Sequence, residues 1–261
     1  MPNEAPVDGK FYQAAPPQSL GERLVIAARD RIYRDFLEFC TPRKGDAILD
    51  VGVSDVVTDA ANLLERLYPH PGDLTAVGLG EGEGFRQAYP QVAYQQIRPN
   101  ARLPFEDRSF RFATANAVLE HVGSRADQRR FVAELYRVAE EVFVTVPNRF
   151  FPVEHHTAIP LAHFWDRSFR TACRVLNKGE WAREENLILM RWSGLAELAP
   201  KVAGATVGYT GIRLGPFSSN LFLHLPPRHA MWAAGRGAPR RPSRPMAQPP
   251  AGPGGQRATQ G

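Results

Sequence analysis

Residues 47–57 read AILDVGVSDVV, a short apolar run that contains Asp50 and is closed by Gly52. The apolar run predicts a buried strand, and the glycine after it predicts a turn in which the backbone can approach a ligand closely. Predicted strands and helices alternate along the chain on the C-terminal side of this stretch. The alternation predicts a doubly wound, mostly parallel α/β sheet, with Asp50 and Gly52 at its ligand-binding switch point.

The other elements follow from hydrophobic periodicity and from breaks at Gly and Pro. We expect strands at 47–51, 74–79, 92–97, 110–115 and 141–146, and an antiparallel edge pair at 205–214 and 220–225. We expect helices from Ser19 onward, where Ser19 and Glu22 have capping-box spacing, and at 55–68, 83–90 and 124–138. Residues 147–199 are rich in aromatic side chains and His, and we interpret them as a substrate-facing insertion.

Charge and composition divide the chain into three parts. Residues 226–261 hold six Arg, eight Pro and six Gly but no Asp, Glu or Lys, so the net charge of +5 becomes −1 without them. Such a composition cannot bury enough apolar surface to offset the entropy cost of ordering. We therefore predict a flexible N-terminus at 1–18, one domain at 19–225 and a disordered tail at 226–261. Trp232 is the one aromatic residue of the tail, so we expect at most weak contacts with nucleic acid or acidic membranes.

Cysteine usage and hydropathy favour a cytoplasmic protein. Cys40 and Cys173 are the only cysteines and have no CxxC spacing, which fits a reducing compartment and argues against a zinc site. The N-terminal residues lack the apolar core of a signal peptide, and no apolar run approaches the roughly 20 residues that span a bilayer. We expect no membrane partner, and the near-neutral body gives no support to nucleic acid as the main substrate.

The turn after the first strand argues against a dinucleotide cofactor. A pyrophosphate needs several glycines at a helix N-terminus, whereas Gly52 stands alone before Val53 and Ser54. The carboxylates of Asp50 and Asp55 would also repel a pyrophosphate. A cationic ligand without phosphates, such as S-adenosylmethionine with its sulfonium and ammonium groups, suits this turn better.

The sequence resembles the class I S-adenosylmethionine-dependent methyltransferases. The resemblance rests on ILDVG at 48–52, on LPFEDRSFRFATANAVLEHVGSR at 103–125, and on EEVFVTVPNRFFPVEHHT at 140–157. It covers roughly residues 47–160 and is closest to the group with an LPF-x-D-x-SF motif followed by an EH-V helix. It implies a Rossmann-like methyltransferase fold and S-adenosylmethionine as the cofactor.

The resemblance also implies where that cofactor binds. It places Asp50, Gly52 and Ser54 in the first cofactor loop, and Asn116 at the end of the fourth strand. Two further contacts come from substitutes. The acidic residue that usually binds the ribose aligns with Gly78, and Glu81 is the nearest replacement. The aspartate that usually contacts the adenine aligns with Pro99, and Asn100 is its neighbour.

Other positions depart from the family pattern. Ser54 and Val56 replace two glycines of the usual Asp-x-Gly-x-Gly-x-Gly loop, and Arg111 replaces the usual aspartate after the SF pair. These departures motivate a second hypothesis, a catalytically inactive member that acts as a binding or scaffolding protein. We favour the enzyme because the NAVLEH stretch at the site edge is retained.

The acceptor side of the site is predicted around the fourth strand and the insertion. His121 is the candidate general base for an acceptor hydroxyl, because the pKa of histidine lies near neutrality; the alternative is a ring that only fixes the loop. Glu120, Arg149 and His156 are the candidate acceptor-binding residues. The His and Glu residues at 154–163 lack His-Glu-x-x-His spacing and show no partner cluster, so we expect no metal. We expect a small-molecule or glycan acceptor.

Overall fold

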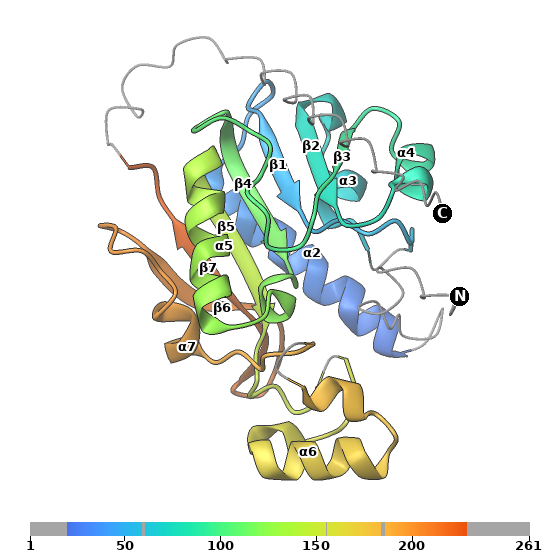
Figure 1. Ribbon diagram of the computed structural model, residues 1–261. Helices are drawn as coiled ribbons and strands as arrows, with labels where there is room; N and C mark the ends of the chain where they lie inside the picture. Colours follow the sequence, from blue (N-terminus) through green and yellow to red (C-terminus); the bar gives the residue numbers. More distant parts are fainter. Residues whose placement is uncertain (1–19, 59–60, 155, 184–185, 229–261) are drawn as a thin grey trace, which may run out of the picture.

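The protein is built around one seven-stranded sheet. A computed structural model describes residues 20–58, 61–154, 156–183 and 186–228 (Figure 1). The strands are β1 (Ile48–Val51), β2 (Leu74–Gly78), β3 (Ala93–Gln96), β4 (Phe110–Asn116), β5 (Ala139–Pro147), β6 (Thr206–Leu214) and β7 (Phe217–Leu225). Their order in the sheet is β3-β2-β1-β4-β5-β7-β6. Neighbours among β1 to β5 are parallel, and β7 is antiparallel to both β5 and β6. The predicted fold class and edge pair are confirmed.

Helices cover both faces of the sheet. The α-helices are α2 (Leu20–Cys40), α3 (Leu63–Leu67), α4 (Glu83–Ala88), α5 (Arg125–Val138), α6 (Asp166–Val175) and α7 (Trp192–Ala196). The 3-10 helices are η1 (Pro71–Asp73), η2 (Leu119–His121), η3 (Ala162–Phe164) and η4 (Gly179–Ala182). Figure 1 shows α5 on one face of the sheet and α2 on the other. The sheet is therefore the middle layer of a three-layer fold.

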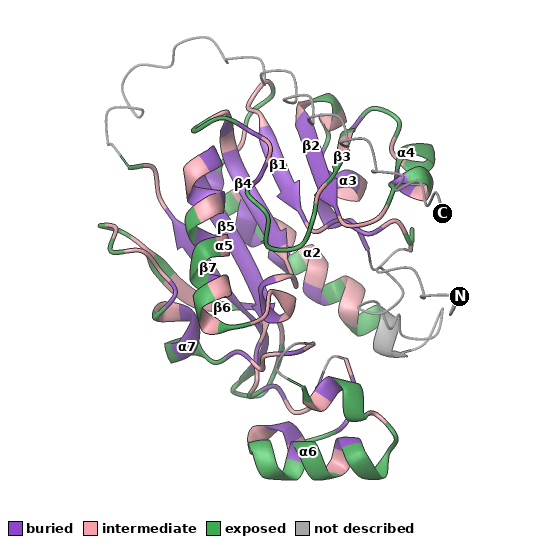
Figure 2. Ribbon diagram, viewed as in Figure 1, coloured by how far each residue is buried: buried purple, intermediate pink, exposed green. Residues whose placement is uncertain are grey.

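The alternation of side chains along the strands builds two apolar layers. Ile48 of β1 packs in the cluster that contains Phe36 of α2, whereas the next residue, Leu49, packs in the cluster that contains Leu135 of α5. Successive residues of a strand point to opposite faces, so a strand that is apolar throughout must be covered twice. Figure 2 shows the central strands buried and the outer faces of the helices exposed. Burial of each such Leu, Ile or Phe contributes roughly 1.5–3 kcal/mol.

The predicted helix at 55–68 is largely wrong, because only Leu63–Leu67 is helical. The side chain of Asn62 explains the late start. Its Oδ1 accepts a hydrogen bond from the backbone N–H of Ser54 at 2.8 Å, and its Nδ2 donates to the carbonyl oxygen of Ser54 at 2.9 Å. This pair of bonds closes the loop on itself and takes the place of a first helical turn. Asn62 has a φ of 49°, a left-handed conformation that Asn tolerates better than most residues.

The predicted helix at 124–138 is confirmed. Ser124 is the N-cap of α5 and forms a capping box with Asp127, in which each side chain bonds the backbone N–H of the other residue. The predicted capping box at Ser19 and the predicted terminal segments at 1–18 and 229–261 lie outside the described residues. The first tail residues are described: the carbonyl oxygen of Pro226 accepts a bond from the Tyr136 hydroxyl at 2.8 Å, and the Arg228 guanidinium lies over the Tyr136 ring.

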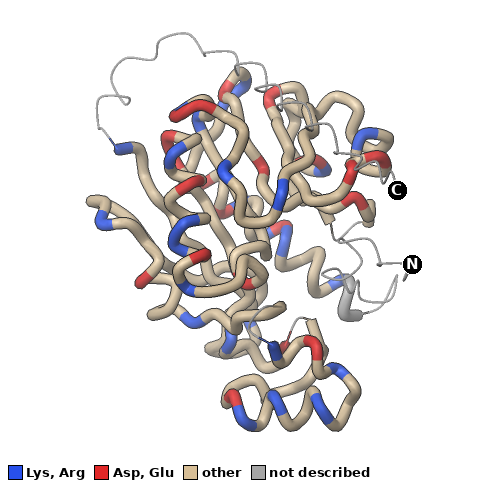
Figure 3. The backbone as a smooth tube through the Cα atoms, in the orientation of Figure 1, with Lys and Arg blue, Asp and Glu red and all other residues tan. Residues whose placement is uncertain are grey.

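The segment between β5 and β6 has a small core of its own. Residues of η3, α6 and η4 pack around the apolar side chains Ile159, Phe169, Cys173, Trp181 and Leu187. Figure 1 shows α6 well away from the sheet. Figure 3 shows acidic and basic residues interspersed over the described surface, in agreement with the near-neutral body. Among the residues that the structure covers, no helix is both long and apolar enough to cross a membrane.

Candidate functional site

The carboxyl end of β1 lies at the switch point of the sheet. β2 and β3 follow on one side of β1, and β4 and β5 on the other. Chain connections leave this point in opposite directions, which opens a crevice where ligands bind in open α/β sheets. Asp50 and Gly52 come to this place as the sequence predicts.

Asp50 is a buried carboxylate at this crevice. Its Oδ1 accepts a hydrogen bond of 2.7 Å from the hydroxyl of Thr114 on β4. Burial raises the pKa of Asp50 to about 6, although the bond from Thr114 and the charge of Arg29 oppose the rise. The carboxylate is therefore ionised at neutral pH, but burial of its charge costs free energy. A cationic ligand would offset that cost.

A second buried carboxylate, Glu65 of α3, lies near Asp50. Neither of its carboxylate oxygens has a hydrogen-bond partner in the described part of the chain. Burial and the charge of Asp50 raise the pKa of Glu65 well above its usual value. Asp50 and Glu65 thus form a pair of acidic side chains. Asp50 accepts a side-chain hydrogen bond from Thr114, whereas Glu65 has no hydrogen-bond partner among the described residues. No sequence motif marks Glu65, because it lies within an apolar helical pattern.

Gly52 is required by both its conformation and its neighbour. Its φ is +92°, and a Cβ at this position would lie 2.3 Å from a methyl carbon of Val118. Its N–H donates to the carbonyl oxygen of Val77 on β2 at 2.8 Å. The turn therefore passes tightly under the loop that follows β4, as a close-approach glycine predicts.

Ser54 makes its hydrogen bonds within the loop that follows β1. It is fully buried, its backbone is bonded on both sides by Asn62, and its hydroxyl accepts from the N–H of Val56 at 3.0 Å. The side chain that replaces the second family glycine thus stabilises the altered turn.

The ribose side of the expected cofactor position differs from the family pattern in a way that the structure explains. A Cβ on Gly78, at the end of β2, would lie 2.8 Å from the carbonyl oxygen of Val53 and 2.8 Å from the hydroxyl of Tyr94. No acidic side chain fits there. Glu81 and Asn100 are both exposed on loops beyond the strand ends, and the carbonyl of Glu81 accepts a bond from Arg86.

Asn116 ends β4 beside the same crevice. Its Oδ1 accepts a hydrogen bond of 2.6 Å from the hydroxyl of Thr145 on β5. The side chain is half-buried and is oriented by this bond. The methionine side of the expected cofactor position therefore fits S-adenosylmethionine through Asp50 and Gly52, whereas the ribose side lacks the usual carboxylate.

The acceptor candidates form one cluster at the carboxyl end of β4. Glu120 and His121 belong to η2, and His156 comes from the loop after β5; one ligand-type atom of each lies within 4.8 Å of the others. The Nε2 atoms of the two histidines are 3.1 Å apart. Glu154 holds His156 through a 2.8 Å contact between its Oε1 and Nδ1 of the ring. The sequence grouped Glu154 with His156 but did not show that His121 meets them.

Backbone groups of residues 186–190 contact Glu120, His121 and Arg149. The N–H of Ile188 donates to the carbonyl oxygen of Glu120 at 2.8 Å, and the carbonyl oxygen of Asn186 lies 2.6 Å from Nδ1 of His121. The N–H of Arg149 donates to the carbonyl oxygen of Met190 at 2.8 Å. No motif in the sequence marks this segment, because all three contacts use its backbone.

Burial and charge set the protonation of the cluster. Burial raises the pKa of Glu120 to about 7 and lowers the pKa of His121 to about 4. Burial also opposes ionisation of Glu154, but hydrogen bonds from His156 and Thr157 prevail and lower its pKa to about 2. The bond to Glu154 raises the pKa of His156 against its burial. The His121 ring is thus neutral and lies beside the ionised carboxylate of Glu154.

A small cavity adjoins this cluster. It is lined by Glu120, Pro147, Asn148, Arg149, Glu154, His156, His163, Leu187, Ile188, Leu189 and Met190. Arg149 is partly engaged within the protein, because its guanidinium contacts Asp166 at 2.6 Å and the carbonyl oxygen of His163 at 3.0 Å. Glu120, Arg149 and His156 therefore border one cavity, as residues that contact an acceptor should.

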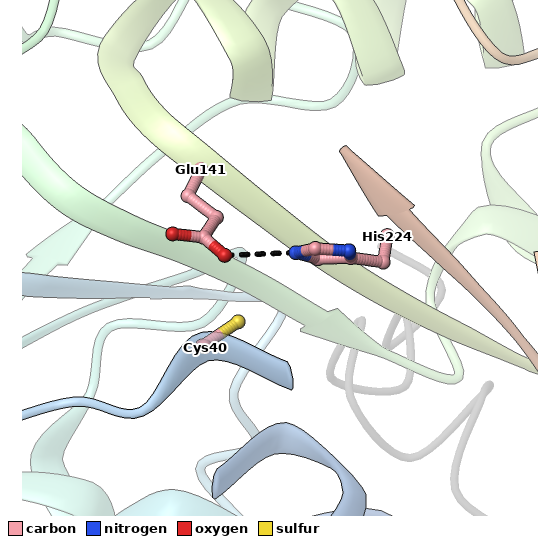
Figure 4. Close-up of side chains that lie close together, drawn as sticks. All are labelled: Cys40, Glu141 and His224. Carbon is pink, nitrogen blue, oxygen red and sulfur yellow. Dashed lines mark hydrogen bonds and ion pairs between the residues drawn. The ribbon is translucent and has the colours of Figure 1, made fainter. Parts of the chain in front are cut away.

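A second cluster of ligand-type side chains lies at the opposite end of β5. Cys40 of α2, Glu141 of β5 and His224 of β7 point toward one another (Figure 4). Glu141 contacts His224 at 2.8 Å and Arg111 at 3.2 Å. Arg111, which replaces the usual family aspartate, is therefore explained by the buried carboxylate of Glu141.

Comparisons with known proteins agree with this arrangement. Residues 49–141 match the family model described as a methyltransferase domain. No curated protein sequence matches the chain.

Solved structures share the fold at low sequence identity. One is an S-adenosylmethionine-dependent methyltransferase, possible histamine N-methyltransferase, from Thermotoga maritima, with 16% identity over 78% of this chain and 90% of that chain, and a TM-score of 0.50. Another is the PH0226 protein from Pyrococcus horikoshii OT3, with 12% identity over 85% and 96% and a TM-score of 0.52. A third is the N-methyltransferase NodS from Bradyrhizobium japonicum, in complex with S-adenosylhomocysteine, with 10% identity over 80% and 88% and a TM-score of 0.50. Residues 49–141 are thus similar to a methyltransferase domain, and the solved structures share the fold of the chain.

Proposed function

We propose that this chain, whose methyltransferase domain places it in the class I S-adenosylmethionine-dependent family, transfers a methyl group to a small-molecule or glycan acceptor. One observation carries the proposal most directly: a buried carboxylate, Asp50, lies at the switch point two residues before the tightly packed Gly52. The S-adenosylhomocysteine bound by the NodS structure supports the same cofactor for this fold.

The residues that would hold the cofactor lie at the carboxyl ends of β1 and β4. Asp50 would attract its cationic methionine end, Gly52 would allow the backbone to approach, and Asn116 would orient the β4 side of the crevice. Ser54 would contribute through the shape of the loop, whereas Glu81 and Asn100 would contact the nucleoside only from exposed loops. When bound, the cofactor supplies an electrophilic methyl group for in-line transfer.

The chain's own contribution is to position the acceptor and to manage its proton. In-line transfer depends chiefly on holding two reactants in an attack geometry. The cavity beside Glu120, Arg149 and His156 would place the acceptor at the edge of the β4 end. His121 is the candidate general base for an acceptor hydroxyl; its pKa of about 4 keeps the ring neutral and able to accept a proton, but makes it a weak base.

Calorimetric titration with S-adenosylmethionine and S-adenosylhomocysteine tests the proposal. We expect micromolar binding to the wild type and at least tenfold weaker binding to Asp50→Asn, which keeps the shape of the side chain but removes its charge. Because the pKa of Asp50 is raised to about 6, affinity should be full above pH 6 and should fall as the pH drops below it.

The matched control is Asp30→Asn, which removes an aspartate from an exposed ion pair with Arg66. Such pairs contribute little to stability, so this variant should bind like the wild type. Absence of binding to the wild type at millimolar ligand would reject the enzyme and leave the inactive binding protein as the alternative. The alternative is supported by the lack of space for an acidic side chain at Gly78, where the family usually has the residue that binds the ribose.

A further inference from the structure

The contact between the two histidines of the acceptor cluster is unusual for two neutral rings. Nδ1 of His121 faces the carbonyl oxygen of Asn186, and Nδ1 of His156 faces a carboxylate oxygen of Glu154. Both oxygens accept hydrogen bonds, so both Nδ1 atoms carry protons. In a neutral imidazole the remaining nitrogen then presents a lone pair. The two Nε2 atoms, 3.1 Å apart, therefore need a cation between them or a proton on one of them.

Glu120 distinguishes between those two possibilities. Its side chain is 1% exposed, and neither carboxylate oxygen has a hydrogen-bond partner among the described residues. A proton shared by His121 and His156 would leave this carboxylate without a ligand. A buried polar group left without a partner costs roughly 1–3 kcal/mol, and more when it is charged. A metal ion between the two Nε2 atoms would use the carboxylate as well.

The distances fit a single ion. Two nitrogens bound at about 2.0–2.1 Å to a tetrahedral zinc ion lie about 3.3 Å apart, close to the observed 3.1 Å. One oxygen of Glu120 lies within 4.8 Å of a ring nitrogen of each histidine, so a rotation about the side-chain bonds would bring it into the same ligand set. Two histidines and one carboxylate make a common ligand set for zinc and other divalent transition metals.

The surroundings are those of a supported metal site. Histidine ligands usually donate their other ring N–H to a carboxylate or a carbonyl group, which fixes the tautomer and the ring orientation. Glu154 does this for His156, and the carbonyl of Asn186 does it for His121. Glu154 is itself held by the N–H and hydroxyl of Thr157, each at 2.6 Å. The rings are therefore oriented before any ion binds.

We propose that Glu120, His121 and His156 bind one divalent transition-metal ion, with zinc as the preferred ion, and that Glu154 is a positioning residue for this site. Glu120 and His156 line the small cavity beside the cluster, so a fourth ligand could reach the ion from that side. Three protein ligands and one open position are typical of catalytic zinc sites.

The role of the ion rests on the proposed methyl transfer. An oxygen donor of the acceptor would complete the coordination, and the ion would lower the pKa of that oxygen. This favours acceptors that present a hydroxyl group. Since Nε2 of His121 would then be a ligand, the same atom would not act as a general base.

Metal binding can be measured without the cofactor or an acceptor. Full-length protein is stripped with a chelator, then titrated with Co²⁺ while its visible absorption is recorded, and with Zn²⁺ in competition with a chromophoric chelator. We expect one equivalent with a Kd at or below the micromolar range. His156→Ala and Glu120→Gln should each weaken binding by at least 100-fold. Glu154→Gln should weaken it by about 10- to 100-fold, as removal of an orienting partner does.

Cys40→Ala is the matched control, because Cys40 belongs to the other ligand-type cluster and should leave the affinity unchanged. Circular dichroism confirms that each variant is folded, and Glu120→Gln preserves side-chain volume if His156→Ala does not fold. Absence of stoichiometric binding to the wild type, or equal binding by His156→Ala and Glu120→Gln, would overturn the proposal. The result is independent of the cofactor titration, so failure of one proposal is distinguishable from failure of the other.

Discussion

The two ends of the sheet each carry a buried cluster of histidine and carboxylate, and the two clusters differ in how their charge is balanced. At the amino end of β5, Glu141 contacts both Arg111 and His224 (Figure 4). At the carboxyl end of β4, Glu120 has no hydrogen-bond partner in the described part of the chain. The first cluster satisfies its carboxylate within the protein, and the second does not.

We infer from this difference that the first cluster serves the fold and that the second serves a ligand. A buried ion pair with all its partners in place needs nothing further, and removal of one partner is strongly destabilising. A buried carboxylate without a partner is unfavourable unless a ligand or a metal completes it. The same distinction applies to Glu65, whose carboxylate has no hydrogen-bond partner in the described part of the chain and whose pKa is raised by burial and by the charge of Asp50.

The largest effect is expected from Glu141→Gln. The neutral amide would leave the guanidinium of Arg111 and the ring of His224 without their shared carboxylate. We expect the free energy of unfolding to fall by about 3–5 kcal/mol, the usual cost of breaking a buried pair. Urea denaturation followed by circular dichroism measures the change. A loss below about 1 kcal/mol would mean that the amino-end cluster is not the structural element we infer.

A smaller loss is expected from Glu154→Gln in metal-free protein. The folded pKa of Glu154, about 2, lies below its ordinary value of 4.5, so its stabilisation is fully present above pH 4.5 and is lost as the pH falls through 2. The shift corresponds to about 3 kcal/mol at neutral pH. Denaturation of wild type and variant at several pH values should show a gap of this size that closes below pH 4.5. A gap that does not depend on pH would contradict the assignment.

The smallest effect, and one of opposite sign, is expected from Glu120→Gln in metal-free protein. The folded pKa of Glu120, about 7, lies above its ordinary value of 4.5, so burial destabilises the ionised form increasingly as the pH rises from 4.5 through 7. We expect the variant to be more stable than the wild type by about 1–3 kcal/mol above pH 7 and equal to it near pH 4. If the Glu120→Gln variant were less stable than the wild type at all pH values, Glu120 would be a structural residue, as we infer for Glu141.

Much of the fold could be predicted from the sequence because local signals agreed with one another. The apolar runs of β1, β2 and β4 predicted buried strands, and the apolar spacing over 124–138 predicted α5. The helix at 55–68 was predicted wrongly because its apolar spacing is helical. The competing bonds from Asn62 to the backbone of Ser54 are specific side-chain contacts that periodicity does not report.

The candidate site was only partly predictable. Asp50 and Gly52 follow from one stretch of chain and from the rule that ligands bind at the switch point of an open sheet. The partnership of His121 with His156 joins residues 35 positions apart, and it depends on how the loop after β5 folds back. The family departures at Gly78 and Arg111 also became intelligible only through Tyr94 and Glu141, their neighbours in space.

The sequence by itself determined the α/β architecture and the position of the turn after β1, because periodicity and short motifs are properties of neighbouring residues. Only the tertiary structure decided which buried carboxylates have ion-pair or hydrogen-bond partners within the protein and which do not. That difference depends on distances between side chains from different strands, such as Glu141 with His224 and Glu120 with His156. Electrostatic energy in a protein interior is set by those distances and by burial, and neither is written in the order of residues along the chain.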